Sequence, residues 1–224
     1  MKPRLSRQRE AAMTLFEVGV VIAILMVLAM LLLPTLAKFK RKSSRIYCVN
    51  NLKQIGLAFR IWEGDNGDLY PMAVPVTRGG SMELVQSGNV ISTFQVMSNE
   101  LTTPKILVCC GDMNNPGDTS RTFATNFGSL SNSNISYFVG VNLTNEINPQ
   151  LMLSGDCNFE ISGRPVHSGL LSLQTNDPVG WLPPRHGSYG YLGFADGSAQ
   201  GATTHGLRSY LGQTGLATNR LAIP

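Results

Sequence analysis

A few residues in this chain have types and positions that could do chemistry. Glu17 is a carboxylate inside an apolar run, where a charge is costly in lipid and therefore marks a candidate functional site. Four cysteines, at positions 48, 109, 110 and 157, could form disulfides or bind metal. His186 is followed after nine residues by Asp196 and Gly197, and Asp-Gly is a dipeptide typical of hairpin turns.

Acid–base or nucleophilic catalysis is one interpretation of the histidines. His167, His186 and His205 are 19 residues apart, but their neighbours do not repeat. The sequence has no Gly-x-Ser-x-Gly elbow, phosphate-binding Walker loop or His-Glu-x-x-His motif. We therefore favour structural roles, in which His186 bonds to the backbone in a turn and Asp196 caps the turn at Gly197. The sequence predicts no enzyme and no cofactor.

The cysteines are the strongest candidates for covalent links. Their positions are Cys48, Cys109, Cys110 and Cys157. Four cysteines allow three connectivities. A disulfide between the adjacent residues Cys109 and Cys110 would be strained. No Cys-x-x-Cys pair or His/Cys group has the spacing of a zinc site, and the run 65–68 lacks the distal Glu of a calcium loop. We expect no metal site.

The element that must position Glu17 is the run Met13–Ala37. Its 25 residues include only Thr14, Glu17 and Thr35 with polar side chains. As a helix it would reach roughly 37 Å, enough to cross a hydrocarbon core of about 30 Å. A cleaved signal peptide has a shorter apolar region and a small-residue site, which Pro34–Lys38 does not supply. A plain membrane anchor fits the length but leaves Glu17 unexplained.

Charge is divided unevenly along the chain. It has 18 Lys and Arg against 14 Asp and Glu, a net +4. Residues 1–12 and 38–45 hold four and five of the basic residues, so residues 46–224 keep nine basic and twelve acidic residues, a net −3. The basic clusters resemble membrane-surface anchors. A nucleic-acid-binding face is not indicated, and we expect no nucleic-acid partner.

The helix is predicted to continue beyond Pro34, because membrane helices tolerate proline. Apolar residues then recur every three or four positions, which is typical of one face of an amphipathic helix. They are Ile46, Val49, Leu52, Ile55, Phe59 and Trp62, with Ser43, Ser44, Asn50, Asn51, Lys53, Gln54 and Arg60 on the other side. Gly64 and Gly67 end the pattern. We expect one helix of about 50 residues whose second half packs on its own domain.

Residues 64–224 are predicted to form a β-rich domain. Short apolar or alternating runs are separated by Gly, Pro, Asn and Ser. The expected strands are Thr93–Met97, Ile106–Cys110, Ile135–Val139, a run within 150–159 that enters a turn at Ser154–Asp156, and Tyr189–Ala195, which ends at the Asp196-Gly197 turn. The fold class is therefore α+β, a long N-terminal helix packed on an antiparallel β-rich domain.

The run Ala12–Val18 resembles the processing motif of type IV prepilins and of type II secretion pseudopilins. In that family a peptidase cuts after a small residue, usually Gly, and the new N-terminus is methylated. The resemblance implies cleavage between Ala12 and Met13, with Ala12 in place of the usual Gly. Glu17 and Pro34 then fall at mature positions where the family carries the same residue types, and both are expected to serve assembly.

A second resemblance concerns pilin-like proteins with a His-x9-Asp-Gly element, abundant in planctomycetes and verrucomicrobia. His186, Asp196 and Gly197 match that element. The run Cys48–Ala58 matches the family's stretch after the membrane span, and Tyr70-Pro71 matches its aromatic-Pro pair. Cys109–Asp112 matches its Cys-Pro-x-Asp step except at Cys110 and Gly111. The run 155–158 resembles a family turn.

The match places Cys48 and Cys109 at family cysteine positions and leaves Cys110 and Cys157 as additions. We therefore predict the bridges Cys48–Cys109 and Cys110–Cys157. Two bridges that share neighbouring residues are strained, so one bridge with two free thiols is the alternative.

The resemblance implies a leader over residues 1–12, a transmembrane half of the long helix over 13–37, an amphipathic half over 38–63 and an extracytoplasmic domain over 64–224. The chain would be a pilin-like subunit of a type II secretion pseudopilus or type IV pilus-like filament. Its partners would be other pilin-like subunits, a prepilin peptidase and an inner-membrane assembly platform. We expect it in the bacterial inner membrane and then in a filament. The alternative is a membrane-anchored binding module that never polymerises. A tip subunit that binds DNA or a secreted substrate is a third hypothesis.

Overall fold

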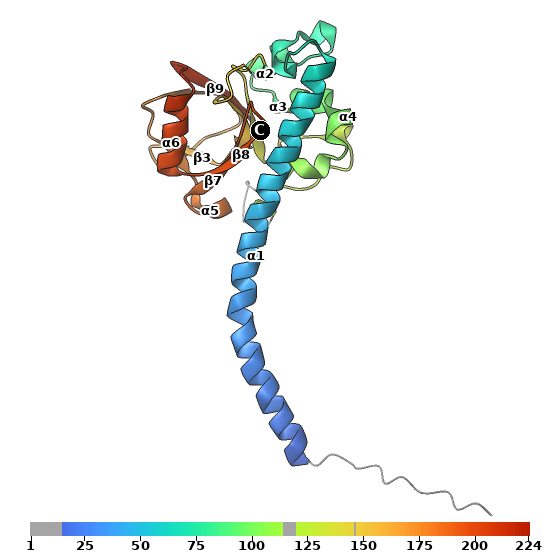
Figure 1. Cartoon of the computed structure of the whole chain (residues 1–224), viewed down its shortest axis with the longest axis vertical. Coiled ribbons are helices and arrows are strands. Elements are labelled where there is room, and N and C mark those ends of the chain that lie inside the picture. The colour runs from blue at the N-terminus through green and yellow to red at the C-terminus, as the bar shows by residue number, and fades with distance from the viewer. Residues whose placement is uncertain (1–14, 114–119, 146) are drawn as a thin grey trace, which may run out of the picture. The chain divides into compact units, whose positions relative to one another are not determined.

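The computed structural model describes residues 15–113, 120–145 and 147–224. Two compact units are distinguished, Met1–Ser43 and Ser44–Pro224. Helix α1 (Leu15–Asp65) has 51 residues, as Figure 1 shows. The prediction of one helix of about 50 residues that continues through Pro34 is therefore confirmed. The fold is α+β, with an N-terminal apolar helix and a C-terminal antiparallel β-sheet domain.

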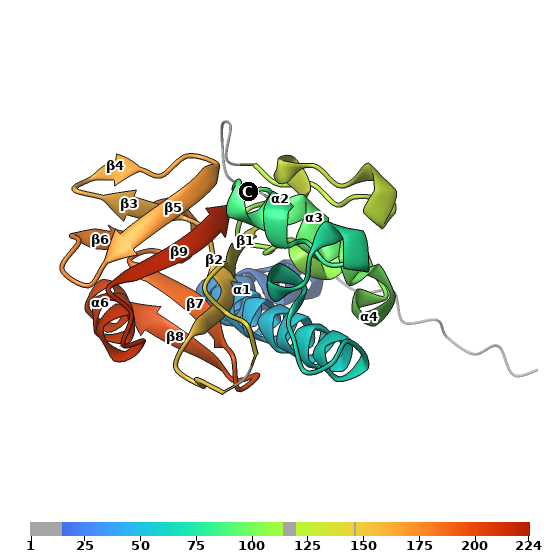
Figure 2. The same cartoon turned by 90° about the horizontal axis from the view of Figure 1, so that it is seen from above.

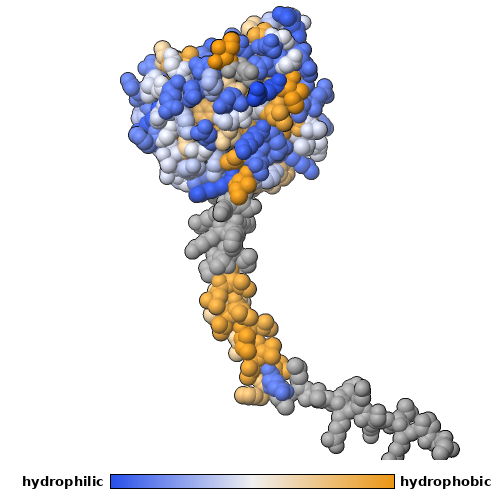
Figure 3. All heavy atoms as spheres, viewed as in Figure 1, coloured by the Kyte–Doolittle hydropathy of each residue, from blue (hydrophilic) through white to orange (hydrophobic). Residues whose placement is uncertain are grey.

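In the first unit, Leu15–Leu32 is apolar on every side apart from the carboxylate of Glu17. Within the described residues, Leu15–Leu32 is the one helical segment long and apolar enough to span a membrane. Every residue in it is exposed, and its side chains form the hydrophobic surface of the helix in Figure 3, which one hydrophilic patch interrupts near its lower end. A helix that is apolar all round requires an apolar environment on all sides.

The second unit contains the other half of α1, and here the helix has one buried face. Cys48, Leu52, Ile55 and Phe59 are each at most 1% exposed, at the three- and four-residue steps that place side chains on one face. Two details of the prediction were wrong. Ile46 is 53% exposed rather than part of the core, and Asn51, expected on the polar side, is only 2% exposed.

Residues 71–134 form short helices rather than the strands predicted there. The elements are η1 (Pro71–Ala73), η2 (Val76–Arg78), α2 (Met82–Gln86), α3 (Val90–Val96), α4 (Ser98–Leu101), η3 (Pro104–Leu107), η4 (Phe127–Ser129) and η5 (Asn132–Asn134). The predicted strand Thr93–Met97 lies largely in α3, because the Asn89 side chain caps that helix and buried residues recur at helical spacing. The predicted strand Ile106–Cys110 begins inside η3, which Pro104 and the Thr103 side chain initiate.

The sheets follow from residue 137 onward. Strands β5, β9, β1, β2, β7 and β8 form a six-stranded sheet in that order, and β4, β3 and β6 form a smaller one. All described pairings are antiparallel. The strands are β1 (Tyr137–Gly140), β2 (Met152–Asp156), β3 (Phe159–Ile161), β4 (Arg164–Pro165), β5 (Gly169–Gln174), β6 (Val179–Trp181), β7 (Tyr189–Phe194), β8 (Ala199–Thr203) and β9 (Thr218–Ile223); helices α5 (Pro183–His186) and α6 (Thr204–Gln213) lie between them.

The six-stranded sheet separates two hydrophobic cores. Successive side chains of a strand point to opposite faces. Tyr137 and Val139 of β1 accordingly join the core that contains α1, whereas Phe138 joins the core formed with β3, β6 and α6. Figure 2 shows α2, α3 and α4 on one side of the domain and the small sheet with α6 on the other. The predicted strands at Ile135–Val139 and Tyr189–Ala195 are confirmed, but Ser154–Asp156 belongs to β2 and is not a turn.

Candidate functional site

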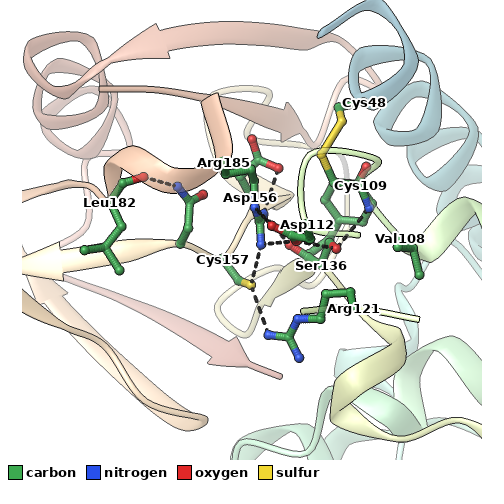
Figure 4. Close-up of polar contacts among 12 residues, drawn as sticks. Cys48, Val108, Cys109, Asp112, Arg121, Ser136, Asp156, Cys157, Leu182 and Arg185 are labelled. Atoms are coloured by element: carbon green, nitrogen blue, oxygen red, sulfur yellow. Dashed lines mark hydrogen bonds and ion pairs between the residues drawn. A yellow bond between two sulfur atoms is a disulfide. The ribbon is translucent and has the colours of Figure 1, made fainter. Parts of the chain in front are cut away.

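The candidate site lies where the second half of α1 meets the segment after η3. A disulfide joins Cys48 of α1 to Cys109, as Figure 4 shows, and this is the first of the two predicted bridges. No disulfide joins Cys110 to Cys157, so the second predicted bridge is wrong. Asn51, one turn beyond Cys48, donates hydrogen bonds to the carbonyl of Val108 and to the hydroxyl of Tyr137.

Beside the disulfide, three charged residues form a buried group that we call the ionic cluster: Asp112, Asp156 and Arg185. Arg185 of α5 forms ion pairs with Asp112 and, at 3.0 Å, with Asp156 at the end of β2. The three side chains are between 0% and 4% exposed. Figure 4 shows the Arg185 guanidinium group between the two carboxylates. One cation between two carboxylates leaves the cluster with a formal charge of −1.

Neighbouring groups complete the hydrogen bonding of the cluster. Ser136 Oγ donates to Asp112 at 2.6 Å and accepts from the backbone N–H of Cys109 at 2.9 Å. Asp156 also accepts from the backbone N–H of Tyr191 at 2.9 Å. Buried charges persist when they are paired and hydrogen-bonded in this way. The cluster therefore connects α5, β2 and β7 with the segment after η3.

Burial and pairing act against each other on the pKa values of these groups. Burial raises the pKa of Asp112 and of Asp156, although the attraction of Arg185 works to lower both. For Arg185, burial works to lower the pKa, but the nearby Cys157, Asp112 and Asp156 outweigh it and raise the pKa above its ordinary value. Arg185 therefore stays charged and is the group that holds the two carboxylates together.

His186 contacts the disulfide rather than the backbone. Its Nε2 lies 3.2 Å from Cys109 Sγ and 3.9 Å from Asp156 Oδ2, so the predicted backbone bond in a turn is wrong. Burial, together with the positive charge of Arg185, lowers the pKa of His186 to about 4. The imidazole is therefore neutral at pH 7. A disulfide sulfur carries no hydrogen, so Nε2–H donates and the neutral ring has its proton there.

The other end of the His-x9-Asp-Gly element also meets α1. Asp196 Oδ1 accepts from the backbone N–H of Ser198 at 2.8 Å, so it caps the β7–β8 turn as predicted. Gly197 has a φ of +79°, a conformation that glycine adopts without strain. Arg60 of α1 donates to the carbonyl of Asp196 at 3.2 Å. A Cβ built on Gly56 of α1 would lie 3.5 Å from the Gly197 Cα, so the turn and the helix are close.

The two ends of the element thus contact α1 at two places. His186, three residues before β7, contacts the disulfide of Cys48, and the turn after β7 contacts Arg60 and Gly56. The disulfide joins α1 to the segment after η3, the ionic cluster joins that segment to β2 and α5, and the β7–β8 turn contacts α1 directly. The carboxylates, the guanidinium group and the imidazole are almost closed to solvent, so the site is suited to holding the elements in place.

Sequence reasoning missed the ionic cluster. Asp112 lies 73 positions and Asp156 29 positions before Arg185, and no local pattern connects them. The available signals were weak. Arg185 precedes the noted His186, and each Asp follows a glycine within a run that was compared with a family motif.

The remaining predicted residues lie in the first unit. Ala12 and Met13, and with them the leader and the cleavage site, lie outside the described residues. Glu17 lies in the first turn of α1. Pro34 lies within the helix, and its side chain is outside the described part. Their predicted roles in processing and assembly stay predictions.

Comparison of the chain with protein-family models, with curated proteins and with solved structures gives no match.

Proposed function

We propose that this protein is a pilin-like subunit of a type II secretion pseudopilus or of a related type IV pilus-like filament. The observation that carries the proposal is the single helix α1. Its first half, through Leu32, is apolar and exposed on all sides, and its second half is the buried core element of a folded domain. A simple membrane tether needs no such continuity, because a flexible linker would serve.

The exposed side of the domain half of α1 has apolar as well as polar side chains. Ile46, Leu57 and Ile61 are 53%, 58% and 46% exposed and are spaced by eleven and four residues, which places them on one side of a helix. The exposed Asn50 and Lys53 lie between Ile46 and Leu57 on that side. Neighbouring subunits in a filament would cover the three apolar side chains together with the apolar surface of the first half, whereas lipid around a monomer covers only the first half. Their exposure thus favours polymerisation over the non-polymerising binding module.

In this proposal the chain is made as an inner-membrane precursor with its domain outside the cytoplasm. A prepilin peptidase cuts between Ala12 and Met13 and methylates the new amine. Glu17 then pairs with the Met13 amine of a neighbouring subunit, because a carboxylate within an apolar bundle requires a partner. An assembly platform moves the subunit from the membrane into the filament.

N-terminal mass spectrometry of the membrane-extracted chain tests processing. A chain that begins at N-methylated Met13 supports the proposal. An intact Met1 terminus in cells with an active prepilin peptidase contradicts it and leaves the anchored binding module as the better explanation.

Glu17→Ala tests assembly. We expect membrane insertion and cleavage to be retained and the filament fraction to fall several-fold, because the contact that sets subunit register is lost. The measurement is the ratio of sheared filament to membrane-bound chain in immunoblots. Val20→Ala, also on the apolar half of α1, is the matched control and should leave the ratio unchanged. An unchanged filament yield for Glu17→Ala would contradict the role given to Glu17.

A further inference from the structure

Cys48, Cys109 and His186 form a compact group of metal-ligand types. The two Sγ atoms and an imidazole nitrogen lie within 4.8 Å of one another, and the nitrogen that faces the sulfurs is Nε2, at 3.2 Å from Cys109 Sγ. Both cysteines are fully buried. In this structure the two sulfurs are bonded to each other as a disulfide, so a metal ion could bind them only after reduction.

We propose that the reduced form of this protein binds one Zn²⁺ ion through Cys48, Cys109 and His186. Around a tetrahedral zinc ion, with Zn–S of about 2.3 Å and Zn–N of about 2.0 Å, two sulfurs lie about 3.8 Å apart and a sulfur and a nitrogen about 3.5 Å apart. Unbonded sulfurs must in any case separate to about 3.5–4.0 Å. Reduction therefore moves the sulfurs to nearly the spacing that zinc requires, and His186 Nε2 already lies 3.2 Å from Cys109 Sγ and within 4.8 Å of Cys48 Sγ.

The charge of the ligands favours a divalent ion. Two thiolates and a neutral imidazole with Zn²⁺ add no net charge to a buried region that already contains the −1 ionic cluster, whereas a monovalent ion would add a second negative charge. Thiolate and imidazole are the ligands that zinc prefers. The bound ion would replace the disulfide as the link between α1 and the segment after η3.

The chemistry balances with a phosphine as the reductant. The phosphine gives two electrons to the disulfide and takes the oxygen of one water molecule to become a phosphine oxide. The two hydrogens of that water go to the sulfurs of Cys48 and Cys109. Zinc binding then releases both thiol protons to solvent, and the imidazole proton moves from Nε2 to Nδ1 so that Nε2 can bind.

The test uses the full-length chain in detergent, stripped of metal and compared in its oxidised and phosphine-reduced states. Zn²⁺ affinity is measured by competition with a chromophoric chelator, and Co²⁺ is added as a spectroscopic probe. We expect the oxidised chain to bind neither ion. The reduced chain should bind one Zn²⁺ and, with Co²⁺, give the thiolate-to-metal charge-transfer band of a tetrahedral site.

Variants assign the ligands. His186→Ala should weaken Zn²⁺ binding at least about tenfold, and the double variant Cys48→Ser with Cys109→Ser should abolish it. Cys110→Ser is the matched control and should bind as the wild type does. The proposal is overturned if the folded, reduced wild type binds no Zn²⁺, if it unfolds on reduction and Zn²⁺ does not restore it, or if binding survives in the double variant or is lost in Cys110→Ser.

Discussion

The two halves of helix α1 are one continuous element in two different environments. Residues 15–32 are exposed on every side, whereas in the domain half Cys48, Leu52, Ile55 and Phe59 are buried and Ile46, Leu57 and Ile61 are exposed. Uniform apolarity gives a helix no preferred side, so only an apolar medium or a bundle of helices can cover it. A pattern that repeats every three or four residues gives one preferred side, and a single domain covers it. The difference shows that the helix boundary and the domain boundary do not coincide.

The largest effect should come from the buried ionic cluster that adjoins the domain half. Arg185→Ala leaves Asp112 and Asp156 buried without their cation, so we expect the free energy of unfolding to fall by about 3–5 kcal/mol. Denaturant unfolding of the full chain in detergent measures it. Arg78→Ala, on an exposed residue, should change little.

A rescue variant tests whether charge is the cause of that loss. Arg185→Met combined with Asp112→Asn and Asp156→Asn removes all three charges, so much of the lost stability should return. A cost below about 1 kcal/mol for Arg185→Ala would mean that solvent reaches the carboxylates.

Identical substitutions in the two halves of α1 test the comparison itself. Leu52, 1% exposed, and Leu25, 58% exposed, can both be changed to Ala. We expect Leu52→Ala to cost about 3 kcal/mol of domain stability through lost burial and a cavity, and Leu25→Ala to cost less than about 0.5 kcal/mol. Leu57→Ala, also 58% exposed, is the control within the domain. Equal costs at positions 25 and 52 would remove the distinction between the halves.

The disulfide sharpens the comparison because it joins α1 to the sheet domain covalently. Cys48 and Cys109 are 61 positions apart, so their bond restricts the unfolded chain. The double variant Cys48→Ser with Cys109→Ser should lose about 2–4 kcal/mol, measured by denaturant unfolding with a chelator present to exclude metal. Cys110→Ser should be nearly neutral, and a similar loss in that variant would argue against the assigned bridge.

The smallest expected effect is the pH dependence of the stability that neutral His186 contributes. The pKa of His186 is lowered to about 4, so the unfolded chain, with an ordinary value of about 6.5, binds the proton first as pH falls. Stability from the neutral imidazole is therefore present above pH 6.5 and is lost toward pH 4. The stability difference between the wild type and His186→Gln should shrink by about 2 kcal/mol between pH 7 and pH 4.5.

Comparison with the variant is necessary because Asp112 and Asp156 act in the opposite direction. Their raised pKa values make the folded chain bind protons first, which lowers stability as pH rises. Both groups are present in the wild type and in the variant, so their contribution cancels. A pH-independent difference would show that the ring is solvated.

Periodicity predicted the long helix, its passage through Pro34 and its buried face, because these patterns depend on neighbours a few residues apart. The same local information predicted the strand and turn at Tyr189–Gly197. It failed for residues 71–134, where short apolar runs suit a strand or a helix equally. There the Asn89 cap and the packing of α3 on α2, η1 and β1 decide in favour of helix.

The amino-acid sequence by itself determined that the chain has an apolar helix, a carboxylate within it, and a negatively charged domain with turn-rich strands. Only the tertiary structure decided that Arg185 lies between Asp112 and Asp156, that His186 faces the disulfide, and that Cys157 stays free. The reason is physical. Secondary structure responds to local backbone and side-chain preferences, whereas a buried ion pair or a contact between His186 and the disulfide requires residues that the fold brings together across 29 and 77 positions.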